Sequence, residues 1–225
     1  MVQVVGPAVE ILEEDLSNVL QDIEVAARTC YKSAPGTQAN TLTFIKMLVD
    51  RGHESVFEHV KITVKFICDR GVSHELVRHR LASYSQESTR YCNYSENKFG
   101  NSISVIDISG GMFMDTPKDA DERSIDNDLA IKTLWFKAME AAEAVYLKMI
   151  DLGAAPQIAR SVLPNSLKTE IIMTANIRQW RTVFKQRTAA AAHPQMREVM
   201  IPLLLMFREQ IPILFDDIKH AHEKE

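Results

Sequence analysis

Cysteine is scarce in this chain, and the spacing of its cysteines excludes two kinds of stabilising site. The 225 residues include Cys30, Cys68 and Cys92 and no other cysteine. An odd number of widely spaced cysteines does not indicate a disulfide framework, and no CxxC pair is present to begin a zinc site. With 46% hydrophobic and 25% charged residues, the composition is that of a globular protein held by a hydrophobic core.

Long apolar runs and an excess of positive charge are also missing. No run approaches the ~20 apolar residues that span a bilayer, and the first residues lack the charged and apolar regions of a secretory signal. The net charge of −4 gives no overall attraction to nucleic acid or to anionic membranes. We therefore expect a cytoplasmic protein with no nucleic-acid or membrane partner, in which any basic site is local.

Common nucleotide and metal motifs are absent as well. No GxGxxG follows a strand pattern and no GxxxxGK[ST] occurs, so a bound nucleotide would not use the Rossmann or P-loop devices. Residues His53, Glu54, Glu58 and His59 resemble a metal-binding group, but a zincin helix needs His-Glu-x-x-His. On a helix, His53 and His59 would point about 240° apart. We therefore expect no metal.

Hydrophobic periodicity predicts the fold class. The clearest strand lies at 60–68, where apolar residues alternate with polar ones. Further strands are expected at 103–109 and 167–176, a surface loop at 110–128, and helices at 14–31, 41–52, 73–83, 128–152, 155–164, 177–187 and 194–220, the last interrupted at Pro202 and Pro212. This order predicts a single α+β domain over residues 1–225, with a central mainly antiparallel sheet flanked by helices, including a long helix near 128–152.

The stretch RHRLASYSQESTRY, residues 78–91, is rich in hydrogen-bond donors and has Leu81 and Ala82 as its expected core residues. Arginine, rather than lysine, suits bidentate binding of phosphate or carboxylate, and the serines add short hydroxyl donors. The expected helix 73–83, with Ser73 as its N-cap, places the stretch just after a strand, where ligand sites are frequent. A solvated basic helix face is the alternative, but the clustering favours an anion site.

A second basic group lies at Arg160 and in NIRQWRTVFKQR. Asn176 is a candidate helix cap, and Arg178 and Arg181 are three residues apart, on one helix face. Arg187 lies nine residues beyond Arg178 and nearly opposite to it around the helix. Arg178 and Arg187 would therefore address different ligands or different subunits.

Arg78, His79 and Arg80, followed after seven residues by Ser88, resemble the signature of the flavin-dependent thymidylate synthases. The similarity extends to SxRY at Ser88–Tyr91, to AARTCY and GHESVFEH before it, and to IARSVLP and the Asn176–Arg187 segment after it. The resemblance spans roughly residues 20–200.

The resemblance implies a homotetramer that binds FAD and builds each active site from several subunits. It implies that dUMP becomes dTMP in de novo biosynthesis, with methylenetetrahydrofolate giving the methylene and NADPH the hydride through the flavin. By position, the expected FAD contacts are His53, Ser55, Arg78, His79, Arg80, Gln86, Asn176, Arg178 and Thr182. The expected dUMP contacts are Glu75, Leu76, Val77, Arg78, Gln86, Glu87, Ser88, Thr89, Arg90, Arg160 and Arg187.

Arg187 matches the arginine credited with favouring an ionised N3 of the uracil ring, and is the expected catalytic residue. Ionised N3 makes C5 more nucleophilic, and a guanidinium stabilises that anion best in a water-poor cavity. Two positions depart from the family: some members carry Gln at the position of Glu75, and some carry Asn or His at the position of Thr182. Ser88 has no paired base in the sequence, so we interpret its hydroxyl as a ligand donor rather than a nucleophile.

Two alternatives are disfavoured by the residues. A non-catalytic phosphate- or RNA-binding module would need a basic surface and exposed aromatics, whereas the chain is acidic and 7% aromatic. A cysteine nucleophile, as in unrelated thymidylate synthases, needs an accessible electropositive niche. Cys68 belongs to the strand pattern, and Cys30 lies where a small side chain suffices. Cys92, near Arg90, is the one serious candidate, but it is outside the motif, so we expect a mechanism without a thiol.

Overall fold

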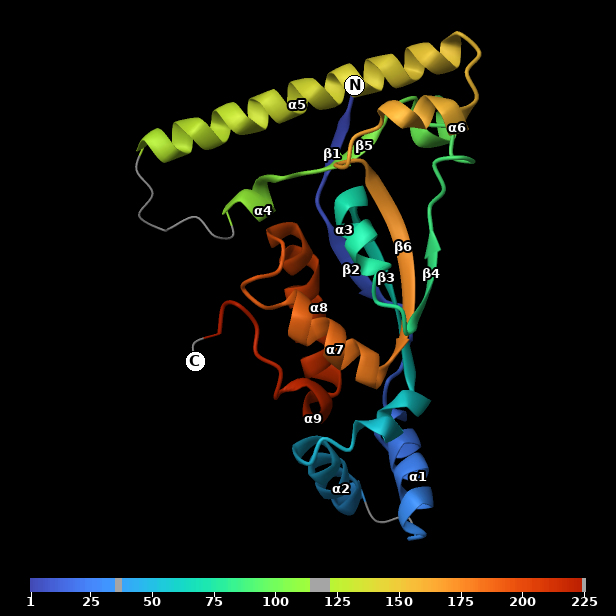
Figure 1. Ribbon diagram of the computed structural model, residues 1–225, viewed down its shortest axis with the longest axis vertical. Helices are drawn as coiled ribbons and strands as arrows, with labels where there is room; N and C mark the ends of the chain where they lie inside the picture. The colour runs from blue at the N-terminus through green and yellow to red at the C-terminus, as the bar shows by residue number, and fades with distance from the viewer. Residues whose placement is uncertain (35–37, 114–121, 224–225) are drawn as a thin grey trace. The chain divides into compact units, whose positions relative to one another are not determined.

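The structure is a computed structural model that describes residues 1–34, 38–113 and 122–223. Its larger sheet has four strands (Figure 1). Their order across the sheet is β2 (Ala8–Ile11), β3 (Lys61–Asp69), β6 (Lys168–Asn176) and β4 (Ala82–Gln86). Each of the two central strands, β3 and β6, leads directly into a helix that carries or adjoins expected site residues.

Hydrogen bonds fix the direction of the central pair. The Ile177 N–H donates to the Val60 carbonyl at 3.0 Å, and the hydroxyls of Thr63 and Thr174 are 3.1 Å apart. Residue numbers rise along β3 while they fall along β6, so the two strands are antiparallel, as predicted. A second sheet has two parallel strands, in which β1 (Gln3–Val5) pairs with β5 (Ser104–Ile106).

Helices make up much of the remaining described chain, which confirms the α+β class. The long helix is confirmed as α5 (Glu122–Asp151), which begins six residues before its expected start at 128. The other helical elements are α1 (Val19–Tyr31), α2 (Gln38–Asp50), η1 (Glu54–His59), α3 (Arg70–Leu76), η2 (Asn97–Phe99), α4 (Ser109–Phe113), α6 (Pro156–Ala159), η3 (Arg160–Val162), α7 (Ile177–Arg187), α8 (Pro194–Gln210) and α9 (Pro212–Phe215).

The chain forms two compact units, and each is described by itself. The first unit comprises Met1–Ala8, Phe66–Arg78 and Ser85–Ile171. The second unit comprises Val9–Lys65, His79–Tyr84 and Ile172–Glu225. All four strands of the larger sheet, β2, β3, β4 and β6, have residues in both units, and the single domain over residues 1–225 stays a prediction. In the part of the chain that the structure describes, no helix has both the length and the apolar character of a membrane span.

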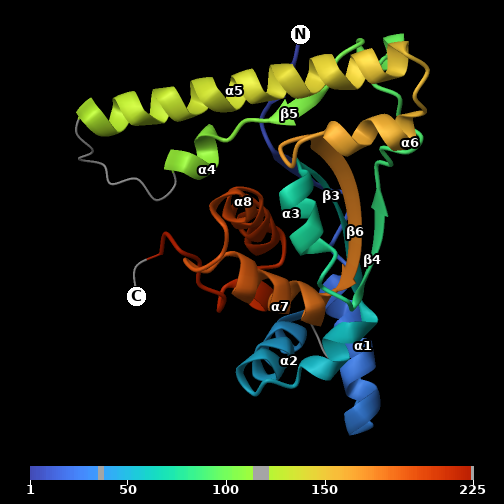
Figure 2. The same cartoon turned by 45° about the horizontal axis from the view of Figure 1, so that its top comes forward.

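An aromatic cluster forms the core of the second unit and seats α7, which packs against α8 (Figure 2). Trp180 and Phe184 of α7 meet Phe207 of α8 and Phe215 of α9, with ring centroids 5.0 to 5.7 Å apart. The Trp180 indole also donates to the Ile62 carbonyl of β3 at 3.0 Å. These contacts hold α7 on two sides, so side chains on its other faces start from a fixed backbone.

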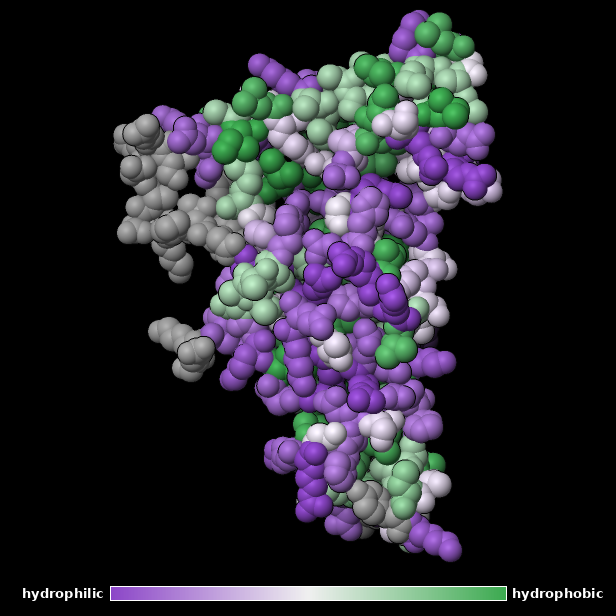
Figure 3. Space-filling view, viewed as in Figure 1, coloured by the Kyte–Doolittle hydropathy of each residue, from purple (hydrophilic) through white to green (hydrophobic). Residues whose placement is uncertain are grey.

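The first unit has a core of its own beneath α5. Met139 and Tyr146 of α5 are buried with Ile103, Val105 and Tyr94. The Glu143 carboxylate accepts the Ile103 N–H at 3.1 Å and so ties α5 to the chain beside β5. Apolar side chains also gather on the visible surface over α5 (Figure 3). This helix therefore buries one face in its own unit and exposes a second apolar face.

The helix expected at 73–83 is shorter and starts earlier. Asp69, not Ser73, is the N-cap, and its side chain accepts the Val72 N–H at 2.6 Å. The Ser73 hydroxyl instead lies inside α3 and donates to the Arg70 carbonyl at 2.9 Å. The prediction was wrong because Asp69, a capping residue about as favourable as serine, stands four positions upstream at the end of the strand and caps the helix there.

The donor-rich stretch therefore lies on a turn and a strand rather than on a helix. Helix α3 ends at Leu76, residues 77–81 form the turn, and residues 82–86 form β4 beside β6. Leu81, expected in the core, is 72% exposed. Strand β4 escaped detection because its sequence, ASYSQ, is polar on both faces, so that pairing with β6 rather than an apolar pattern defines it.

Three smaller expectations also change. Pro202 lies inside α8 on an exposed position and does not interrupt it. The expected loop at 110–128 includes the end of α4 and the start of α5, while residues 114–121 lie outside the described residues. Strands β1 and β2 were not expected from the sequence. Both are short, and the sheets that they join give them their definition.

Candidate functional site

In the second unit, the turn before β4 brings two parts of the sequence into contact. The Arg187 Nε donates to the His79 Nε2 at 3.0 Å, although the residues are 108 positions apart. His79 is 7% exposed, whereas its neighbour Arg80 is exposed. The Tyr84 hydroxyl donates to the His79 carbonyl at 2.8 Å and holds the turn against β4. The structure thus unites the expected catalytic arginine with the middle residue of the signature.

A cavity of about 330 Å³ lies at the start of η1 in the second unit. Gly52, at a φ of 66° that favours glycine, closes α2 and turns the chain toward His53. The cavity is lined by three expected cofactor contacts, His53, Ser55 and Arg178, together with Cys30, Leu48, Gly52, Glu54 and Val56. Segments from α1, α2, η1 and α7 therefore border one cavity.

Helix α7 begins with a side-chain cap and carries three of the expected residues. The Asn176 Oδ1 accepts the Gln179 N–H at 2.8 Å, so the interpretation of Asn176 as a cap is confirmed. The Arg178 Nη1 lies 2.5 Å from the Glu58 Oε1, and both side chains are about half exposed. The Thr182 hydroxyl donates to the Arg178 carbonyl at 3.1 Å. These bonds fix the first turns of α7 beside the cavity.

In the first unit, several expected nucleotide contacts are joined by hydrogen bonds. The Arg160 Nη1 donates to the Thr89 hydroxyl at 3.2 Å across 71 positions of sequence. The Arg90 N–H donates to the Ser88 hydroxyl at 3.3 Å, and the Arg90 side chain is exposed. Arg78 is exposed at the end of this unit's α3 segment. Hydroxyl and guanidinium donors from distant segments therefore converge near Thr89.

Gln86 and Glu87 are held by partners within the first unit. The Gln86 amide donates to the Ser73 hydroxyl at 2.8 Å and to the Thr169 hydroxyl at 3.2 Å. The Glu87 Oε1 accepts the Tyr94 hydroxyl at 2.8 Å. Both side chains are thus partly committed to the protein, and their polar ends are held in place.

The remaining expected contacts lie at the end of α3. Leu76 is fully buried and belongs to the core, Glu75 is half-buried, and Val77 is exposed. The contact at Leu76 therefore stays a prediction for its backbone alone. The described residues contain no group of three or more His, Cys, Asp or Glu side chains arranged to hold a metal ion.

The three thiols differ in environment. Burial raises the pKa of the Cys68 thiol to about 12, as expected for a strand residue facing the core. Burial and the charge of Glu87 raise the pKa of Cys92 above its ordinary value. Cys30 is exposed and borders the cavity at η1. The most serious nucleophile candidate, Cys92, therefore has an environment that opposes thiolate formation.

Comparison with known proteins places these features in a family. The family model described as "Thymidylate synthase complementing protein" matches residues 12–213. A flavin-dependent thymidylate synthase of Corynebacterium aurimucosum is 34% identical over 200 residues, which cover 87% of this chain and 78% of that protein. The chain belongs to the flavin-dependent thymidylate synthase family. This confirms the resemblance and the expected enzyme class, that of methyltransferase-type enzymes dependent on a flavin.

Two further relatives agree with this membership. A probable flavin-dependent thymidylate synthase of Mycobacterium phage D29 is 33% identical over 214 residues, covering 92% of this chain and 86% of that protein. The crystal structure of a UMP/dUMP methylase from Streptomyces cacaoi, bound with 5-Br UMP, has a TM-score of 0.76 at 24% identity. That similarity covers 95% of this chain and 94% of the other, and it shows that the fold is shared.

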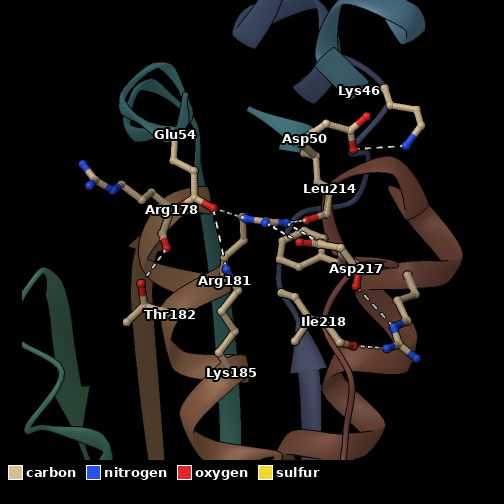
Figure 4. Close-up of polar contacts among 12 residues, drawn as sticks. Lys46, Asp50, Glu54, Arg178, Arg181, Thr182, Lys185, Leu214, Asp217 and Ile218 are labelled. Carbon is tan, nitrogen blue, oxygen red and sulfur yellow. Dashed lines mark hydrogen bonds and ion pairs between the residues drawn. The ribbon is translucent and has the colours of Figure 1, made fainter. Parts of the chain in front are cut away.

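Arg181 of α7, grouped by sequence with the ligand-facing arginines, is instead a buried structural residue (Figure 4). Its Nε donates to the Glu54 Oε1 at 2.9 Å, and its Nη1 and Nη2 donate to the Asp217 carboxylate at 2.8 and 2.7 Å. Its Nη1 also donates to the Leu214 carbonyl. Burial disfavours the charge, but the two carboxylates outweigh it and raise the pKa of Arg181. Arg181 thus ties η1 and the C-terminal segment to α7.

The sequence did not indicate that Arg181 supports the fold or that Tyr84 holds the turn at His79. Their spacing allows a ligand-facing position equally well, because a side chain's partner is set by segments distant along the chain. Glu54, which borders the cavity, was considered only as a metal ligand. Its contact with Arg181 makes it a support for the adjacent residues of η1.

Replacement of Arg181 should destabilise this protein far more than replacement of Arg178 on the same helix. In Arg181→Met, Glu54 and Asp217 lose a buried partner, which should lower the free energy of unfolding by about 3 kcal/mol, the lower end for a broken buried pair. Arg178→Met removes an exposed pair with Glu58 and should cost less than ~1 kcal/mol. Urea unfolding of the FAD-free proteins measures both. Equal losses for the two variants would contradict the structural role of Arg181.

Proposed function

We propose that this protein is a thymidylate synthase that converts dUMP to dTMP with bound FAD, methylenetetrahydrofolate and NADPH. The observation that carries the proposal is the hydrogen bond between Arg187 and His79, which joins the signature to the C-terminal arginine segment. Family membership supplies the reaction class, and this contact explains why two distant motifs belong to one chemistry. The expected cytoplasmic location belongs to the same proposal.

The residues at the η1 cavity suit a flavin nucleotide. His53, Ser55 and Arg178 offer an imidazole, a hydroxyl and a guanidinium around about 330 Å³. Exposed Arg78 and Arg80 of the signature offer the forked donors that a diphosphate prefers. Asn176 and Thr182 support the start of α7, where Arg178 borders the η1 cavity. When bound, FAD would pass the hydride of NADPH to the nucleotide, while these residues hold it in position.

A nucleotide phosphate suits the donors of the first unit. Arg160 is already joined to Thr89, and Ser88 and Arg90 follow in the same loop. Because the hydrogen bond between Arg160 and Thr89 already holds these side chains, a bound phosphate would meet donors that are fixed in position. Gln86, Glu87 and the end of α3 (Glu75, Leu76, Val77) would complete the surroundings of dUMP.

Arg187 would act on the uracil ring. Its guanidinium stabilises negative charge at N3, which raises the electron density at C5. C5 then forms the new bond to the methylene carbon, the C5 proton is lost, and the incoming hydride completes the methyl group. The methylene donor leaves as tetrahydrofolate, because the hydride comes from NADPH and not from the folate.

We also propose the homotetramer, and α5 supplies its support. Ile131, Leu134, Ala138, Ala141 and Val145 succeed one another at steps of three and four residues, and all are exposed. This heptad spacing forms a narrow apolar seam, here called the α5 seam, that suits a helix of another subunit. Among these residues, the Leu134 side chain is 67% exposed, and contact of so large an apolar side chain with water is unfavourable.

The reaction is tested by the fate of the folate. Purified protein with FAD, NADPH, dUMP and methylenetetrahydrofolate should yield dTMP and tetrahydrofolate in equal amounts, with one NADPH oxidised per turnover. Chromatography of the products measures this, and omission of NADPH is the control. If dihydrofolate accumulates in step with dTMP, the folate has supplied the hydride and the proposal fails.

Turnover should not depend on a thiol. Because the pKa of Cys92 is raised, Cys92→Ser should retain dTMP formation within about tenfold of wild type, or ~1.4 kcal/mol of barrier. Initial rates at saturating substrates, normalised to bound FAD, provide the measurement, and Cys30→Ser, tested separately, should also retain turnover within about tenfold. A loss of several orders of magnitude in folded, flavin-loaded Cys92→Ser would establish a cysteine mechanism instead.

A charge in the α5 seam should dissociate the assembly. Leu134→Glu should reduce the mass found by light scattering, since a buried carboxylate at a helix seam has no partner. If active sites are shared between subunits, the dissociated protein should also lose turnover. Thr133→Glu, which adds the same charge beside the seam, should keep both mass and activity. An unchanged mass for Leu134→Glu would rule out the seam as the subunit contact.

A further inference from the structure

We propose that His79 is a positioning residue for Arg187: its neutral imidazole accepts the Arg187 Nε–H and so fixes the guanidinium for uracil activation. The proposal rests on the proposed function, because it concerns a step of that reaction. The expected contact of His79 with the flavin stays a prediction, and the proposal gives the imidazole a further role.

The chemistry of the pair fixes the state of the imidazole. Arginine has donors and no acceptor, so a hydrogen bond of 3.0 Å from Arg187 Nε requires a lone pair on His79 Nε2. His79 therefore carries its proton on Nδ1 while the contact is made, and a doubly protonated ring would repel the guanidinium. The contact specifies one tautomer of one residue.

The surroundings of His79 hold the ring in place. His79 is 7% exposed, while Arg78 and Arg80 on either side are exposed, so the signature alternates outward, inward and outward. The Tyr84 hydroxyl donates to the His79 carbonyl at 2.8 Å. Burial raises the pKa of Tyr84 to about 12, so this donor keeps its proton under ordinary conditions. The His79 side chain, in the middle of the signature, is thus buried within the second unit, and its backbone is held by Tyr84.

A fixed Nε determines the plane of the guanidinium. The arginine side chain is long and rotates about several bonds, so an unrestrained guanidinium spends little time in one orientation. Arg187 is at the last residue of α7, whose backbone the aromatic core holds in place. With its backbone fixed at one end and its Nε fixed by His79, the guanidinium presents a set direction to its ligand. Such preorganisation acts mainly on the reactive step, since the ionised ring needs it most.

The test compares an acceptor at the Nε2 position with none. The His79→Phe variant keeps an aromatic ring but loses the acceptor. It should lower kcat for dTMP formation at least tenfold at saturating dUMP, with less than a threefold change in KM. The Gln side chain places an amide oxygen near the Nε2 position, so His79→Gln should recover most of the kcat. His222→Phe, an exposed histidine of the same unit, is the matched control and should behave as wild type.

Further measurements separate positioning from the alternatives. Reduction of bound flavin by NADPH without dUMP should be unchanged in His79→Phe; a loss confined to this step would show that the imidazole acts on the flavin rather than on Arg187 and would overturn the proposal. The double variant His79→Phe/Arg187→Lys should be little worse than Arg187→Lys, whereas additive losses would also overturn it. If the Phe variant does not fold, His79→Asn, whose oxygen is too short to reach Nε2, replaces it beside His79→Gln.

The wild-type assay keeps this proposal distinct from the proposed function. If wild type forms dTMP and His79→Phe has the same kcat, the positioning role is excluded and the function stands. If wild type forms no dTMP under flavin-loaded conditions, the proposed function fails first. Recovery by Gln and not by Asn would support the acceptor role in particular.

Discussion

Helix α7 and the contacts that seat it are the constraint on which the second unit depends. Its buried face is held by the aromatic cluster around Trp180 and by the Trp180 hydrogen bond to β3. The Arg181 guanidinium, 2% exposed, adds ionic bonds to η1 and to the C-terminal segment. A charge so deeply buried is tolerated only because two carboxylates and a carbonyl satisfy its donors. The same bonds hold the α7 backbone in place, and this backbone sets the positions from which the Arg178 and Arg187 side chains extend.

The three arginines of α7 thus have three different roles, whereas the sequence separated only Arg187 from Arg178. Arg181 faces inward and supports the fold, Arg178 faces the cavity beside η1, and Arg187 meets His79 at the far end of the helix. The helical period separates Arg187 from Arg178, which lie nine residues apart and nearly opposite each other, whereas the ion pairs with Glu54 and Asp217 distinguish Arg181 from Arg178. A single amphipathic element therefore joins a structural ion pair to two separate polar contacts.

The donor-rich stretch is arranged by a different principle. It lies on a turn followed by a strand, so the helical period does not apply to it, and in the turn Arg78 and Arg80 are exposed while His79 is buried. Farther along, the loop after β4 presents Ser88, Thr89 and Arg90, and Arg160 reaches Thr89 from η3. Exposed arginines grouped in this way suit bidentate binding of an anion. The arrangement accounts for a chain that is acidic overall yet locally basic.

The sequence by itself determined the α+β class, the central strands, the long helix and the family, because each depends on local periodicity or on a motif of adjacent residues. It also indicated the Asn176 cap. Only the tertiary structure decided that Asp69 rather than Ser73 caps α3, that β4 replaces the end of a helix, and that Leu81 is exposed. It alone separated Arg181 from Arg178 and joined Arg187 to His79. The contacts of Arg181 with Glu54 and of Arg187 with His79 join residues 127 and 108 positions apart, and local propensity carries no information about which distant side chain will supply such a partner.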